Sequence, residues 1–150
     1  MSRLNRFFMR APLGLYRAGL GGLLGRRFLR LEHTGRKSGL RRQAVLEVVE
    51  IDDSASPIVA SGYGERSNWY RNVTANPDIA FTVGRKRVLA TAERLDHAEA
   101  VAVLDRYRTN HAKAAKVIGA RLGVSLVDDL DNAASKLPLF RLVPNEGSPP

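Results

Sequence analysis

The sequence predicts an α+β domain whose strands form a closed or partly closed, mostly antiparallel β-barrel. Five strand-like segments occur early in the chain with one short helical segment among them, and a sixth follows a long helical pattern. The connections between the early strands are short, which favours antiparallel pairing, and closing such a sheet removes its edges. At 150 residues the chain is long enough for one domain with its own core.

The first segment, residues 1–26, is basic and amphipathic. Within residues 12–25 the apolar side chains share one helical face, as Leu13, Tyr16 and Leu20 do. Five glycines in the same stretch make this helix weak by itself, so it needs a surface to lie on. That surface is either its own domain, which is the favoured alternative, or a membrane.

Three strands and two turns come next. Arg27–Thr34 is the first strand, and Gly35–Gly39 form a glycine turn. In Gln43–Ile51 apolar residues occupy both faces for part of the length, which indicates a central strand. Residues 52–57 are a polar turn, and Ile58–Ser61 is the third strand.

A short helix and a hairpin follow. Ser67 is a favourable N-cap for a helix over Asn68–Ala75, and Asn76-Pro77 ends that helix. Ile79–Val83 and Arg87–Leu95 form a hairpin because a glycine turn separates two alternating segments.

The C-terminal third is mainly helical. His97–Leu122 keeps helical spacing of apolar residues throughout and predicts one long helix. Val124–Lys136 predicts a shorter helix, and Leu137–Val143 a last strand that returns to the sheet. The resulting organisation is an N-terminal segment over 1–26, a barrel domain over 27–144 and a flexible tail over 145–150.

The positive charge is concentrated in the first third of the chain. Residues 1–42 contain ten arginines and Lys37 against the single acid Glu32, whereas the whole chain carries +9. This asymmetry indicates an anionic partner, which is nucleic acid, a membrane surface or an acidic ligand; a solubilising arm is the alternative. The chain has no cysteine, which excludes disulfides and thiolate metal sites. The absence of cysteine fits a cytoplasmic protein. The basic N-terminal segment adds the alternative that the protein binds peripherally to the inner face of the membrane.

The turn GRKSGLRR, Gly35–Arg42, places four cations around two glycines. Arginine offers bidentate donors to phosphate or carboxylate, and lysine offers a point charge. An ordinary solvated turn is the alternative. Nucleic acid could use the same cations, but readers of single strands interleave them with exposed aromatic residues. Aromatic residues are sparse here, so no nucleic-acid partner is expected.

The loop GYGERS, Gly62–Ser67, begins like a dinucleotide-binding fingerprint. Its third glycine is replaced by Ser67, and a hairpin rather than a parallel strand follows, which excludes a Rossmann site. The two glycines still let backbone N–H groups approach a phosphate or a ring edge; an ordinary strand-to-helix turn is the alternative. On the next helix, Trp69 and Tyr70 either stack on a ligand or pack against the barrel.

The remaining polar residues provide no hydrolytic machinery. His33, His97 and His111 lack metal-ligand spacing, so no metal site is expected, and no Ser/His/Asp or paired-carboxylate arrangement is present. A reaction carried by a cofactor, for which the protein supplies binding and orientation, fits better.

Two motifs together resemble the deazaflavin-dependent nitroreductase family of actinobacteria, which are oxidoreductases that use coenzyme F-420. They are TGRKSG followed by a strand, and VASGYGERSNWYRNVTANP followed by a hairpin, and the similarity covers Leu29–Leu95. The resemblance implies a split β-barrel related to FMN-binding, pyridoxamine-oxidase-like barrels. It also implies a reduced 8-hydroxy-5-deazaflavin as hydride donor, whose phosphodiester and oligoglutamate tail match the excess of positive charge.

The resemblance assigns cofactor binding to three regions. The basic turn binds the phosphate and tail, the following strand lies along the ring system, and the glycine loop with the short helix completes the site. The residues implied are Arg36, Lys37, Ser38 and Arg42 in the turn, Gln43, Ala44, Val45 and Leu46 in the strand, Ala60, Ser61, Gly62 and Tyr63 in the loop, and Asn68, Trp69, Tyr70, Arg71 and Asn72 in the helix.

The expected function is hydride transfer from the reduced deazaflavin to an electron-poor small molecule, such as a quinone, a nitroaromatic or an activated enone. The alternative is a non-catalytic basic module that binds a membrane surface or nucleic acid. Reduction of a quinone also needs a proton. Tyr107 and His111, four residues apart on the predicted long helix, are the candidate catalytic residues. The alternative is that Tyr107 packs in the core and that His111 lies at the rim of the pocket. Val45 stands where many relatives have proline, and Tyr107 is the sole tyrosine after the hairpin, so the acceptor pocket is not matched.

Overall fold

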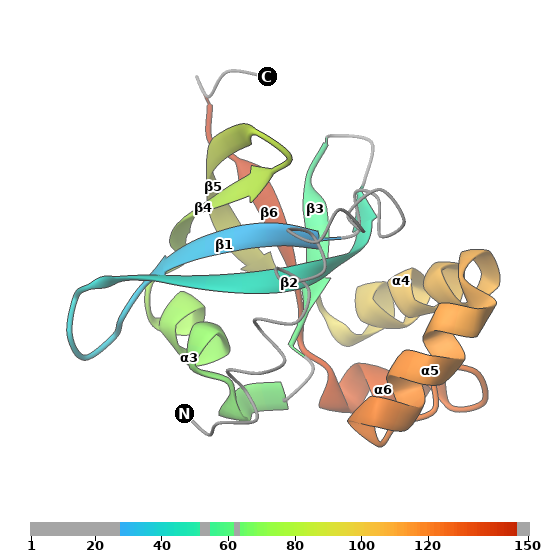
Figure 1. Ribbon diagram of the computed structural model, residues 1–150. Coiled ribbons are helices and arrows are strands. Elements are labelled where there is room, and N and C mark those ends of the chain that lie inside the picture. Colours follow the sequence, from blue (N-terminus) through green and yellow to red (C-terminus); the bar gives the residue numbers. More distant parts are fainter. Residues whose placement is uncertain (1–27, 52–54, 62–63, 147–150) are drawn as a thin grey trace.

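A computed structural model describes residues 28–51, 55–61 and 64–146 of the chain (Figure 1). The expected N-terminal helix, the loop residues Gly62 and Tyr63 and most of the expected tail lie outside the described residues. The boundaries of the N-terminal segment and the tail therefore stay predictions.

Six antiparallel strands form a closed barrel, as the sequence predicts. Strand β1 pairs with β2 on one side and with β4 on the other, which closes the circle β1-β2-β3-β6-β5-β4. The last strand inserts between β3 and β5, so the C-terminal segment completes the wall. The strands are β1 (Phe28–Thr34), β2 (Arg41–Ile51), β3 (Pro57–Ala60), β4 (Asp78–Val83), β5 (Lys86–Arg94) and β6 (Leu139–Pro144).

Alternation along the strands defines the barrel interior. In β1, Leu29, Leu31 and His33 are buried while the residues between them are partly or fully exposed. In β2, Ala44 and Leu46 belong to the same buried side of the sheet. His33 thus occupies a position where the pattern calls for an apolar residue.

One end of the barrel is closed by α3 (Asn68–Ala75), which follows the short 3₁₀ helix η2 (Gly64–Arg66). The side-chain oxygen of Ser67 accepts a hydrogen bond from the Tyr70 N–H, which confirms the predicted N-cap. Figure 1 shows α3 beside the long β1–β2 turn. The two motifs of the sequence therefore meet at this end of the barrel.

The predicted long helix over 97–122 is wrong, because two helices occupy this stretch. Helix α4 (His97–Asn110) ends and α5 (Ala112–Leu122) begins at His111, whose backbone angles, φ −137° and ψ 54°, are not helical. The periodicity of apolar residues continues across this break, so the sequence pattern does not reveal the end of α4.

The predicted helix over 124–136 is also too long. Helix α6 covers Leu130–Lys136, and the Asp129 side chain caps it by accepting from the Asn132 N–H. Figure 1 shows α4, α5 and α6 grouped on one side of the barrel, away from α3. Among the described helices, none is long and apolar enough to cross a membrane.

Candidate functional site

The β1–β2 turn is held in shape by its own backbone and by one serine. The Gly35 N–H donates to the Leu40 carbonyl, the Gly39 N–H donates to the Gly35 carbonyl, and both N···O distances are 2.8 Å. Ser38 Oγ accepts from the Leu40 N–H at 3.2 Å. Gly39 has φ +70°, which favours glycine. Ser38 thus shapes the turn, while the cations at Arg36, Lys37, Arg41 and Arg42 are exposed.

Helix α3 binds this turn through one buried amide. Asn72 Oδ1 accepts from the Arg36 backbone N–H at 3.1 Å and from Arg36 Nη1 at 2.8 Å. On its other side, Asn72 Nδ2 lies 3.1 Å from His33 Nδ1. We call this chain of Arg36, Asn72 and His33 the turn clasp. It joins two predicted cofactor residues that are 36 positions apart in the sequence.

At neutral pH, His33 is uncharged in the folded protein. Burial is the main cause that lowers its pKa from 6.5 to about 4, and the positive charges of Arg41 and Arg42 lower it further. Only 3 % of the residue is exposed. Its Nε2 is buried with no hydrogen-bond partner among the described residues.

The low pKa of His33 predicts a loss of stability in mild acid. Between pH 6.5 and about 4 the unfolded chain binds a proton that the folded protein does not bind. The free energy of unfolding therefore decreases as the pH falls through this window, by about 3 kcal/mol in total. Urea unfolding of the wild type and of His33→Asn at several pH values measures this effect. The same pH dependence in both proteins would contradict the prediction.

The four predicted residues of β2 do not share one face. Ala44 and Leu46 point into the barrel and are 2 % and 8 % exposed, whereas Gln43 and Val45 lie on the outer face. A ring system lying along the outside of this strand would contact the side chains of Gln43 and Val45. Ala44 and Leu46 would support it from inside.

The described part of the glycine loop is closed by hydroxyl groups. Ser61 Oγ donates to the Gly64 carbonyl at 2.6 Å and lies 3.0 Å from Ser67 Oγ. Because the Ser61 hydroxyl proton is used on Gly64, the Ser67 hydroxyl donates to Ser61. Both serines are buried. Ser61 therefore connects the loop to the cap of α3, and Ala60 is half-buried beside it.

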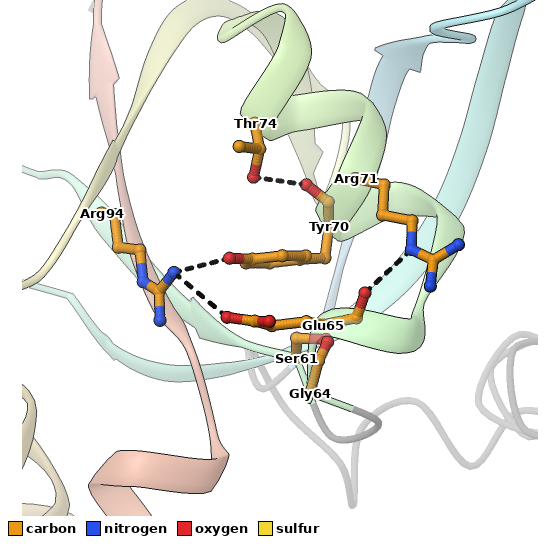
Figure 2. Close-up of polar contacts among 7 residues, drawn as sticks. All are labelled: Ser61, Gly64, Glu65, Tyr70, Arg71, Thr74 and Arg94. Atoms are coloured by element: carbon orange, nitrogen blue, oxygen red, sulfur yellow. Dashed lines mark hydrogen bonds and ion pairs between the residues drawn. The ribbon is translucent and has the colours of Figure 1, made fainter.

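The α3 residue Tyr70 is held by an arginine that sequence reasoning did not single out (Figure 2). Arg94 Nη1 donates to the Tyr70 hydroxyl oxygen at 2.5 Å and lies 4.0 Å from Glu65 Oε1. Arg71 Nε donates to the Glu65 carbonyl at 3.0 Å. These contacts fix η2 against α3 and direct the Tyr70 hydroxyl towards β5.

The aromatic rings of α3 face the core. Trp69 is 4 % exposed, and its ring meets that of Phe140 edge-on with centroids 5.8 Å apart. The Tyr70 and Phe140 centroids are 5.7 Å apart. These contacts favour packing over ligand stacking for both residues. Asn68 is half-buried and Arg71 exposed, so these two remain accessible from outside.

Tyr107 contacts β2 farther along the strand from the β1–β2 turn, and His111 lies beside it. The buried Tyr107 hydroxyl donates to Glu47 Oε1 at 2.9 Å, on the outer face of β2. The Tyr107 and His111 ring centroids are 5.2 Å apart, although His111 is exposed and lies outside the helix. Figure 1 shows α4 well away from α3 and the β1–β2 turn. The structure therefore does not bring this pair to the turn clasp.

Sequence reasoning missed His33 and Arg94. For His33 a signal was present, since it continues the inward alternation of Leu29 and Leu31 and immediately precedes TGRKSG. No such signal was present for Arg94, because its partner Tyr70 is 24 positions away in the sequence and meets it only through tertiary packing. In the described part of the chain, no three His, Asp or Glu side chains are placed to hold a metal ion.

Solved structures similar to this one confirm the fold. The heme storage protein HutZ from Vibrio cholerae has a TM-score of 0.59 at 15 % identity, covering 93 % of this chain and 92 % of that one. A protein of unknown function from Agrobacterium tumefaciens also has a TM-score of 0.59, at 20 % identity, covering 93 % of this chain and 57 % of that one. The expected split barrel is thereby confirmed.

Sequence comparison identifies the family. A curated F420H(2)-dependent quinone reductase of Mycobacterium tuberculosis is 35 % identical over 86 residues, which are 53 % of this chain and 57 % of that protein. A protein of Mycobacterium bovis matches to the same extent. The chain thus spans little more than half the length of these curated relatives. The family model described as F420H(2)-dependent quinone reductase matches residues 9–125. It confirms the resemblance drawn from the two motifs, and the chain belongs to the F420H(2)-dependent quinone reductase family.

Proposed function

We propose that this protein is an oxidoreductase that binds reduced coenzyme F-420 and delivers hydride to an electron-poor acceptor, in the first place a quinone. The observation that carries the proposal is the turn clasp, in which α3 holds the backbone and the guanidinium of Arg36. The clasp lies within the segment that matches the family model. The family description names F420H(2) as the donor and a quinone as the acceptor.

The described residues fit the anionic part of this coenzyme. The Arg36 guanidinium carries five donors, and its hydrogen bond to Asn72 uses one N–H of Nη1. Lys37 is exposed on the same turn and Arg42 at the start of β2, and Arg41 Nη1 is held by Thr34 Oγ1 at 3.0 Å. Cations on a turn of fixed shape suit a phosphodiester followed by carboxylates. When bound, the coenzyme supplies the hydride; the protein binds and orients it.

The proposal predicts a preference for coenzyme F-420 over FMN, since the basic turn suits an anionic tail longer than one phosphate. Side-by-side fluorescence titrations of the full chain measure both affinities, and we expect tighter binding of F-420. Equal or tighter binding of FMN would contradict the prediction. Titrations with single-stranded nucleic acid and with anionic vesicles test the alternative function, and tight binding to either without coenzyme binding would favour it.

The acceptor range is part of the proposal. Nitroaromatics and activated enones are further electron-poor acceptors that a bound hydride donor could reduce. Steady-state turnover with a quinone, a nitroaromatic and an enone at equal coenzyme concentration compares them, and we expect the quinone to have the highest kcat/KM. A cytoplasmic location, and binding of the N-terminal segment to a membrane surface, likewise stay predictions.

For Tyr107 and His111 the contacts favour packing over catalysis. The contact of Tyr107 with Glu47 and the distance of α4 from the clasp favour packing. We expect Tyr107→Phe and His111→Ala to keep wild-type turnover with a quinone between pH 6 and 8, with the proton coming from solvent. A large loss of kcat at unchanged coenzyme affinity in either variant would instead establish a catalytic role.

A further inference from the structure

We propose that His33 is a positioning residue of the coenzyme site, acting through Asn72 to hold Arg36 where it binds the anionic part of the coenzyme. This inference rests on the proposed function and deepens it. It assigns a role to a buried histidine that neither the sequence motifs nor the family resemblance connects with the coenzyme.

The direction of every hydrogen bond in the turn clasp follows from Arg36. A guanidinium only donates, so the atom of Asn72 that faces Arg36 must be the oxygen, Oδ1. Asn72 Nδ2 then faces His33 and donates to Nδ1, at 3.1 Å. Nδ1 must therefore carry no proton, and in the neutral imidazole the proton is on Nε2. The guanidinium of an exposed arginine, which only donates hydrogen bonds, thus fixes the tautomer of a buried histidine.

His33 in turn fixes the amide of Asn72. Without an acceptor at Nδ1, the buried Nδ2 donors of Asn72 would lose this partner, and turning the amide over would place them against the donors of Arg36. Either outcome weakens the hold on Arg36. Burial of His33 among cations, with Arg41 and Arg42 nearby, keeps it in the neutral form that the clasp needs.

The position of the Arg36 side chain depends on this clasp. Its side chain is exposed, and an exposed arginine is otherwise free to adopt many rotamers. The contacts to Asn72 fix both its backbone and its Nη1. A pre-positioned guanidinium binds an anion with a smaller loss of conformational entropy, so the benefit should appear in coenzyme affinity.

Variants of His33 test the inference by titration with oxidised coenzyme F-420. His33→Leu removes the acceptor and should weaken binding about tenfold. His33→Asn, whose Oδ1 replaces Nδ1 as the acceptor, should stay within about threefold of the wild type. In an Arg36→Ala background, His33→Leu should have no further effect, because its action passes through Arg36. Wild-type affinity of His33→Leu, or an undiminished effect without Arg36, would overturn the inference.

A second variant and a second measurement make the test independent of folding and of the coenzyme. Should His33→Leu not fold, Asn72→Leu interrupts the same clasp from α3 and should show the same tenfold loss. NMR of the Arg36 guanidinium in the coenzyme-free protein should show a slowed, ordered side chain in the wild type and a mobile one in either variant. If the wild type does not bind the coenzyme, the proposed function is wrong, and unchanged Arg36 mobility in the variants would separately overturn the clasp.

Discussion

Replacing both Lys37 and Arg42 by alanine is expected to weaken coenzyme binding about tenfold or more and to flatten its dependence on salt. Both side chains are exposed, Lys37 on the β1–β2 turn and Arg42 at the start of β2, so each alone should contribute only about three- to fivefold. Their joint loss is larger because an oligoanionic tail contacts several cations at once. Attraction between exposed charges is screened by salt, and removing two of them therefore reduces the slope of affinity against ionic strength.

The chain offers a matched control for this double variant. Arg85 and Lys86 are exposed on the β4–β5 turn, which also contains a glycine with positive φ, at Gly84. Figure 1 shows the turn of this hairpin in the upper part of the view, away from α3 and the β1–β2 turn at lower left. Arg85→Ala with Lys86→Ala removes the same net charge, and we expect it to leave coenzyme affinity nearly unchanged. Equal losses in both double variants would mean that only net charge matters, and no loss in either would move the tail site elsewhere, for example to Arg26 and Arg27.

The parts of the fold that local chemistry determines could be predicted closely. Helix α3 runs over the predicted residues because Ser67 caps one end and Pro77 prevents its continuation at the other. The strands follow from alternation and from glycine turns. The break at His111 could not be predicted, since it is a change of backbone conformation within an uninterrupted apolar pattern.

The candidate site divides in the same way. The basic turn was visible in the sequence because four cations and two glycines stand together. The role of Asn72 was not, because its amide reaches Arg36 and His33 across 36 and 39 positions of the chain. Likewise the family resemblance implied that Ala44 and Leu46 lie along the ring system, but the barrel closes with their side chains inside. Which predicted residues face a ligand is decided by tertiary packing.

Trp69→Ala is expected to lower the free energy of unfolding by about 3–5 kcal/mol. The indole is 4 % exposed and packs edge-on against Phe140, so its removal leaves a cavity between α3 and the barrel. This loss is a large part of the total stability of a single domain. Urea unfolding measures it, at a low temperature so that the variant is folded in the absence of urea. Trp69→Phe retains an aromatic ring there and should lose less than half as much.

Coenzyme titration of Trp69→Phe decides between packing and stacking for this residue. A ring that packs against Phe140 supports α3 from inside, so a phenylalanine that keeps α3 in place should leave coenzyme affinity within about twofold of the wild type. A ring that stacks on the deazaflavin would give the opposite result, with little change in stability and a clear loss of affinity. Because Asn72 lies on the same helix, one turn further along, Trp69→Ala should also loosen the hold on Arg36. The loss of coenzyme affinity in Trp69→Ala should then accompany its loss of stability. A loss of affinity with unchanged stability would show that Trp69 contacts the coenzyme directly.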